Sequence, residues 1–158
     1  MSDLGEMVER KLNRDTTFDD AARYALISRC AVALAEVHKA GLSHGRGKLN
    51  DFVLTPDNKI GFIDFEEDVD GSGIPLADRQ AREIFLFSCS AARFGKDAVE
   101  HGFLAYRVAY KDPAVTKSLK RFLHLLWPVV TLLGFFRPLL KGDAARAYDA
   151  TVVLLGEI

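Results

Sequence analysis

Residues 44–52, HGRGKLNDF, gather side chains that could bind or transfer a phosphate group. Asp51 lies near the end of this stretch, and Asp64 follows the next apolar run. Carboxylate oxygens are preferred ligands of Mg²⁺, and protein-bound Mg²⁺ commonly contacts substrate phosphates. Lys48 and Arg46 could neutralise the charge of such a phosphate. The pattern predicts a divalent-cation site at Asp51 and Asp64 beside an anion site.

The same residues also have purely structural interpretations. Asp51 could close its loop by accepting backbone N–H groups. Asp64 could form an ion pair with Arg46 or Arg82, since such pairs are common outside active sites. His44 follows a short apolar segment and is expected to be a buried brace of the loop. Arg46 cannot act as a general base, because its guanidinium has no acceptor atom and stays protonated.

Two β-prone runs flank residues 55–59, TPDNK, and predict a small β-hairpin. Asp51 stands at the start of the first run and Asp64 near the end of the second. Because a hairpin brings these ends together, the two carboxylates are expected to approach each other. Glu66 and Glu67 are adjacent and could help to hold a divalent ion.

Helical patterns occupy most of the remaining chain. The spacing of apolar residues predicts one helix over about 18–39 and a second over 76–94, and both carry apolar stripes wide enough to face a core. These two helices are expected to pack against each other. From Lys96 onward the pattern stays helical, with breaks expected near Asp112-Pro113, Pro128, Pro138 and Gly142. The predicted fold class is mainly α with one small β-hairpin.

The order of these pieces resembles the C-terminal lobe of the protein-kinase-like fold. A helix ending in VHKAGLSHG leads into a polar loop, a hairpin, the tripeptide IDF, an acidic loop and a long helix. The nearest likeness is to atypical bacterial kinases: the lipopolysaccharide (Kdo/heptose) kinases and the KEOPS-associated and RIO kinase types. In those, His-Gly-Asp-Leu-x-x-x-x-Asn is followed by Ile-Asp-Phe. The resemblance covers roughly residues 4–94.

The resemblance implies roles for individual residues. Arg46 stands where the family has its catalytic Asp, and Asp51 stands where the family has a metal-binding Asn. Lys48 matches a lysine near the γ-phosphate, and Asp64 matches the metal-chelating Asp. The implied cofactors are ATP and Mg²⁺. Asp51, Lys48 and Arg46 are then the catalytic candidates, Lys48 and Asp64 the cofactor-binding ones, and Asp51 and Asp64 the metal ligands.

Two further features of the kinase-like pattern concern the loop's surroundings. Glu83 falls where the following helix usually carries an acid that braces the backbone of the catalytic loop. The Gly-rich roof and the strand lysine of the N-terminal lobe are absent from these 158 residues. The chain therefore resembles a C-terminal lobe alone, and a protein partner could complete the nucleotide site.

The composition of the chain limits the domain organisation, partners and location that we expect for it. At 158 residues the chain is expected to form a single domain, 1–158, and its formal net charge of −1 gives no general attraction to nucleic acid. No nucleic-acid partner is expected. Cys30 and Cys89 lie on predicted helices and are expected to be reduced, buried thiols. The charged N-terminal stretch is unlike a secretory signal, so a cytoplasmic location is expected.

The most apolar run, residues 122–140, has three interpretations. It contains His124, Pro128, Arg137 and Pro138, which favours a buried helix pair over a membrane-spanning helix. A third interpretation is peripheral contact with the inner membrane through residues 117–140. In that case the basic residues at its start would meet anionic lipid head groups.

Two functions remain open from the sequence. The first is a small atypical kinase that transfers phosphate from ATP to a sugar, a lipid-linked sugar or a protein hydroxyl, using Mg²⁺. The second is a non-catalytic, pseudokinase-like binding module, or a subunit of a larger complex, in which Arg46 marks lost catalysis. Asp64 and Lys48 favour the first function, whereas Arg46 favours the second.

Overall fold

The computed structural model describes residues 5–15, 17–64 and 73–158. Within these ranges the chain is mainly helical with one small antiparallel sheet, as the sequence predicted. In chain order the elements are β1 (Glu6–Met7), α1 (Val8–Arg14), α2 (Asp20–Lys39), η1 (Leu49–Asp51), β2 (Phe52–Leu54), β3 (Ile60–Phe62), α3 (Leu76–Ala91), η2 (Ala92–Phe94), α4 (Lys96–Ala109), α5 (Pro113–Phe135), η3 (Arg137–Leu139) and α6 (Gly142–Glu157).

The predicted hairpin is present as β2 and β3. Phe52 pairs with Phe62 and Leu54 with Ile60 across an antiparallel ladder. The hairpin turn is closed by a hydrogen bond from the Thr55 N–H to the Lys59 carbonyl at 2.9 Å. Strand β1 adds to the free edge of β2. This third strand was not predicted, because two residues are too few to show a period.

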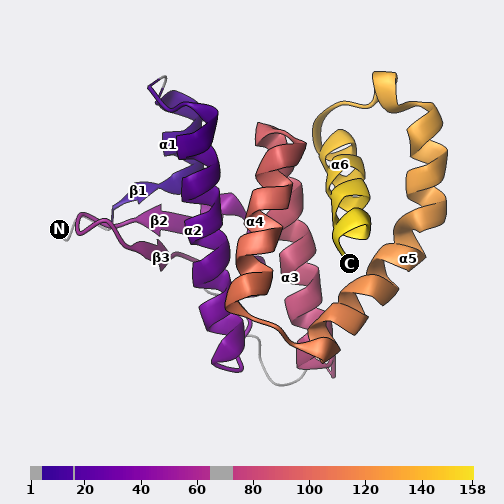
Figure 1. The fold of residues 1–158 in the computed structure, drawn as a ribbon, viewed down its shortest axis with the longest axis horizontal. Helices are drawn as coiled ribbons and strands as arrows, with labels where there is room; N and C mark the ends of the chain where they lie inside the picture. The colour runs from indigo at the N-terminus through magenta and orange to yellow at the C-terminus, as the bar shows by residue number, and fades with distance from the viewer. Residues whose placement is uncertain (1–4, 16, 65–72) are drawn as a thin grey trace.

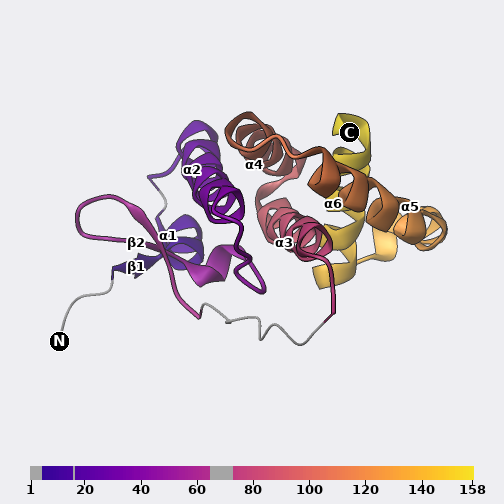
Figure 2. The same ribbon diagram turned by 90° about the horizontal axis from the view of Figure 1, so that it is seen from below.

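Helix α2 packs mainly against α4, not against α3 as the sequence analysis expected. Figures 1 and 2 show α2 and α4 side by side, with the sheet on the other side of α2. The close packing needs Gly102 of α4, where a Cβ atom would lie 3.0 Å from the Phe87 ring and 3.2 Å from Ile27. Helices α2 and α3 still meet, but through buried polar groups.

In the C-terminal third of the chain, the helix break predicted at Pro128 is absent. Asp112 caps α5 by accepting from the Ala114 N–H at 2.7 Å, and Pro113 begins the helix, as expected. Helix α5 then continues through Pro128 to Phe135. Pro128 removes one helical N–H donor, but it lies on the exposed side, where water can satisfy the freed carbonyl. The break between α5 and α6 occurs at residues 136–141, which agrees with the breaks expected near Pro138 and Gly142.

Among the described residues, no helix combines the length and the apolar character that a membrane crossing requires.

Candidate functional site

The loop 44–51 is held against α3 by Glu83, a buried residue of that helix. The His44 N–H donates to Glu83 Oε2 at 3.0 Å, and the Gly45 N–H donates to Glu83 Oε1 at 2.6 Å. Glu83 therefore accepts hydrogen bonds from the loop backbone, which is the contact expected for it from the sequence. The carboxylate fixes the start of the loop against the helical core.

Glu83 also accepts a hydrogen bond from His38 of α2. His38 Nε2 lies 2.8 Å from Glu83 Oε2, and His38 Nδ1 lies 2.7 Å from the Tyr106 hydroxyl of α4. Burial alone would raise the pKa of Glu83, but the hydrogen bonds from His38 and from the two loop N–H groups outweigh it and lower the pKa. Burial raises the pKa of Tyr106, which keeps its hydroxyl protonated. An ionised carboxylate thus joins three helices and the loop.

This arrangement predicts a pH dependence of stability. Because the pKa of Glu83 is lower in the folded protein than its ordinary value, the unfolded chain binds the proton more tightly. The stabilisation that the ionised Glu83 provides is therefore complete above the ordinary pKa of glutamate. It is lost as the pH falls through the lower pKa that Glu83 has in the folded protein. Between neutral pH and about pH 4, we expect wild type to lose more free energy of unfolding than Glu83→Gln. Urea titrations at both pH values test this, and parallel losses in the two proteins would contradict it.

His44 braces the same loop from inside. The His44 side chain is buried, and its Nε2 lies 3.1 Å from the Ile63 carbonyl next to β3. Its Nδ1 accepts from the Gly47 N–H at 3.3 Å. Gly45 and Gly47 have φ angles of 100° and 66°, conformations that side-chain-bearing residues rarely adopt. His44 therefore has the expected bracing role, and the two glycines permit the loop's tight path.

Arg46 lies between the two predicted carboxylates. Its Nη2 lies 3.2 Å from Asp51 Oδ1 and 3.6 Å from Asp64 Oδ2. Asp51 Oδ2 accepts from the Lys48 N–H at 2.9 Å. The side chain of Asp51 is 1% exposed, Arg46 is 41% exposed and Asp64 is 70% exposed. The hairpin thus brings both acids to one cation, and Asp51 also closes the loop through the backbone, as the structural interpretation proposed.

In this structure both predicted metal ligands are paired with groups of the protein itself. Both oxygens of Asp51 already have partners, and the Arg46 guanidinium occupies the position between Asp51 and Asp64. Among residues 5–15, 17–64 and 73–158, no group of three His, Cys, Asp or Glu side chains is arranged to hold a metal ion. Glu66 and Glu67 lie outside the described residues. The Mg²⁺ site at Asp51 and Asp64 stays a prediction.

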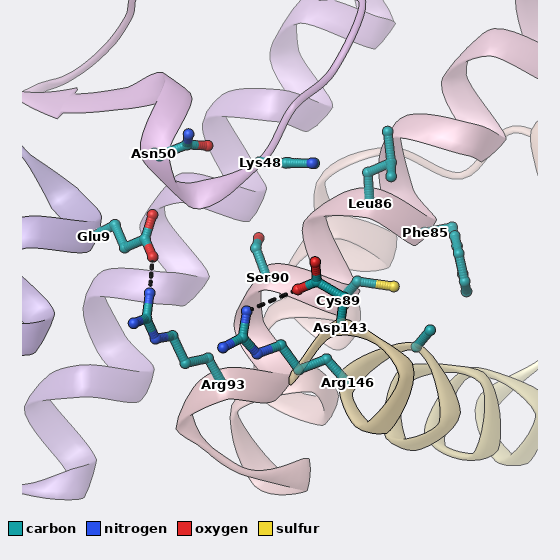
Figure 3. A pocket seen from close by; sticks show the side chains of 11 residues that line it. Glu9, Lys48, Asn50, Phe85, Leu86, Cys89, Ser90, Arg93, Asp143 and Arg146 are labelled. Atoms are coloured by element: carbon teal, nitrogen blue, oxygen red, sulfur yellow. Dashed lines mark hydrogen bonds and ion pairs between the residues drawn. The ribbon is translucent and has the colours of Figure 1, made fainter. Parts of the chain in front are cut away.

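The side chain of Lys48 lies at a pocket that Arg46 does not line (Figure 3). The pocket has a volume of about 310 Å³. Its lining comes from α1, the loop, α3, η2 and α6, and consists of Glu9, Lys48, Asn50, Phe85, Leu86, Cys89, Ser90, Arg93, Asp143, Arg146 and Ala147. Lys48 and Arg46, which the sequence analysis placed together, therefore face different surroundings.

The charges in this pocket are unevenly paired. Arg93 forms an ion pair with Glu9, and Arg146 lies 3.0 Å from Asp143. Lys48 forms no ion pair with any residue that the structure describes. The Asp143 side chain is 98% exposed, so solvent weakens its hold on Arg146. The pocket thus offers one unpaired ammonium and one loosely held guanidinium to an anion.

No known protein family, curated protein or solved structure matches this chain.

Sequence reasoning missed most of this pocket. Arg93 follows α3 and Arg146 belongs to α6, and no motif links either residue to Lys48. Only their charge could have drawn attention, and the chain has 21 Lys and Arg residues, so charge alone does not single them out.

The two cysteines are free thiols, as predicted, and lie on α2 and α3. Cys30 is buried, as expected, whereas Cys89 was expected to be buried and is partly exposed at the pocket. Burial raises the pKa of each thiol to about 12. Both thiols are therefore protonated at neutral pH, and Cys89 is not an activated nucleophile.

Proposed function

We propose that this chain is a kinase-like module that binds a small phosphate-bearing ligand at Lys48 and does not itself supply the acid–base step of phosphoryl transfer. A nucleotide is the first ligand to test. The observation that carries the proposal is the Lys48 ammonium, which has no ion-pair partner among the described residues and lies at a pocket beside a braced loop. A cytoplasmic location, where nucleotides are abundant, is part of the proposal.

The pocket suits an anion with an apolar portion. Lys48, Arg93 and Arg146 provide cations, while Phe85 and Leu86 provide an apolar wall. Its volume of about 310 Å³ lies at the small end of ligand pockets. A phosphate bound to Lys48 would gain a charge-assisted hydrogen bond, and it could replace Asp143 as the partner of Arg146.

The geometry of Arg46 argues against independent catalysis. A general base must reach the acceptor hydroxyl with a free lone pair. Asp51 is buried, and its two oxygens already accept from Arg46 and from the Lys48 N–H, so the carboxylate is poorly placed to reach an acceptor hydroxyl. Arg46 occupies the position of the family's catalytic Asp and cannot accept a proton.

Thermal-shift titration tests the proposal. We expect ATP, ADP or inorganic phosphate to raise the melting temperature of wild type, because a ligand that binds only the native state must stabilise it. Lys48→Met should weaken binding about 10- to 100-fold, the usual range for losing one charge-assisted hydrogen bond. Lys111→Met is the matched control, since Lys111 is exposed and does not line the pocket. The absence of any shift, or equal shifts in wild type and Lys48→Met, would contradict the proposal.

A Mg²⁺-dependent phosphotransferase is the second candidate. It is favoured by one observation: Asp51 and Asp64 both lie within reach of a single cationic side chain. ATP turnover by wild type and Arg46→Ala, with and without Mg²⁺, separates the two candidates. Turnover by either protein that requires Mg²⁺ favours the phosphotransferase, whereas nucleotide binding without turnover favours the binding module.

A further inference from the structure

The C-terminal part of α5 and the turn after it expose an unusual amount of apolar surface. Twelve large hydrophobic side chains are exposed among the described residues, and seven of them fall within 125–139. These seven are Leu125, Trp127, Val129, Leu132, Phe135, Phe136 and Leu139. The other five are spread over the rest of the chain. The seven therefore form a patch, here called the α5 patch, and patches of this kind mark interaction sites.

Helical spacing places much of the α5 patch on one side of α5. Leu125, Val129, Leu132 and Phe136 follow one another at steps of four, three and four residues, so they share a face. Phe135 is 82% exposed and Leu125 is 77% exposed. Both ribbon views place α5 at the outer edge of the molecule, at the end opposite the sheet (Figures 1 and 2).

Within the sequence segment that carries the α5 patch, the charged residues are all basic. Between residues 117 and 141 the sequence has no Asp or Glu, and its basic residues are Lys117, Lys120, Arg121, Arg137 and Lys141. Asp78 of α3 already holds Arg121 through two contacts of 2.7 and 2.8 Å. Lys117 and Lys120 precede the apolar segment and Lys141 follows it, and all three are exposed. Basic residues thus border the apolar face along the chain at both ends.

We propose that the α5 patch docks on an anionic membrane surface, with its apolar side chains in the interface and its lysines at the head groups. Amphipathic helices bind membranes through this combination of apolar area and basic charge. A second copy of the chain fits less well, since it would bring the same lysines towards one another.

Vesicle flotation tests the proposal. Wild type should bind phosphatidylcholine vesicles that contain phosphatidylglycerol at least about tenfold more tightly than vesicles of phosphatidylcholine alone. The double variant Leu132→Asp/Phe135→Asp should weaken binding at least about tenfold, because it removes apolar area and adds like charge. Lys117→Glu/Lys120→Glu should weaken binding to the anionic vesicles by about the same factor. All four side chains are at the surface, so circular dichroism should show native helix content in both variants.

Val108→Asp is the matched control. Val108 lies on α4 away from the patch and is 79% exposed, close to the exposure of Phe135. Its variant should bind vesicles as wild type does. Three outcomes would overturn the proposal: no binding by wild type, equal binding to both vesicle types, or unchanged binding by the Leu132→Asp/Phe135→Asp variant. A concentration-dependent dimer in sedimentation that the same variant abolishes would assign the patch to a second copy instead.

Discussion

Replacing Glu83 by alanine is expected to lower the free energy of unfolding by about 3–5 kcal/mol. The substitution leaves the N–H groups of His44 and Gly45 without their buried acceptor and removes the partner of His38. Unsatisfied buried donors carry the full penalty of desolvation, so the loss exceeds that of a surface ion pair. Urea denaturation at neutral pH measures the change.

Two comparisons make the Glu83 test specific. Glu83→Gln retains one acceptor oxygen and should fall between wild type and Glu83→Ala. Glu100→Ala, which removes an exposed glutamate of α4, should alter the free energy of unfolding by less than about 0.5 kcal/mol. A loss below about 1 kcal/mol in Glu83→Ala would show that the brace is not needed for stability.

The second large effect is expected at Asp51. Asp51→Ala removes the buried acceptor of the Lys48 N–H and the partner of Arg46, and should cost about 2–3 kcal/mol. Arg46→Ala should cost about 1–2 kcal/mol, because the Arg46 side chain is 41% exposed and water can reach the Asp51 oxygen that it leaves. Urea denaturation of both single variants and of the double variant gives the coupling between them.

Glu36→Ala is the control for Asp51, since Glu36 forms an exposed ion pair with Lys39 at 3.7 Å and should contribute less than about 1 kcal/mol. If Asp51→Ala were no more destabilising than Glu36→Ala, Asp51 would not close the loop. If the Asp51 and Arg46 effects simply added, the two side chains would not interact in solution.

Local patterns accounted for the elements that the sequence predicted correctly. The hairpin and α2 depend on neighbouring residues, so periodicity and turn residues were enough to find them. The approach of Asp51 and Asp64 to Arg46 followed from the hairpin, because all three lie near its open end. The contact of Glu83 with the loop backbone was predicted from the order of the motifs along the chain. Periodicity within one helix could not have predicted it, because Glu83 lies 39 residues after His44 in the sequence.

Packing choices were harder to predict. Nothing in the apolar stripe of α2 specifies α4 as its main partner, because that choice depends on the close approach at Gly102. The pocket at Lys48 was missed because Arg93 and Arg146 reach it from separate elements. Pro128 predicts a helix break from the sequence, because the sequence does not show that its side of α5 faces water.

The polar chain from Tyr106 through His38 to Glu83 ties loop 44–51 to the packing of three helices. Its contacts join residues 68, 45 and 39 positions apart in the sequence. The N–H groups at the start of loop 44–51 therefore depend on Glu83 of α3 for their acceptor, although the loop directly follows α2 along the chain. In the native state the amide hydrogens of His44 and Gly45 should therefore exchange with solvent as slowly as those of the helical core, which hydrogen-exchange measurements would show.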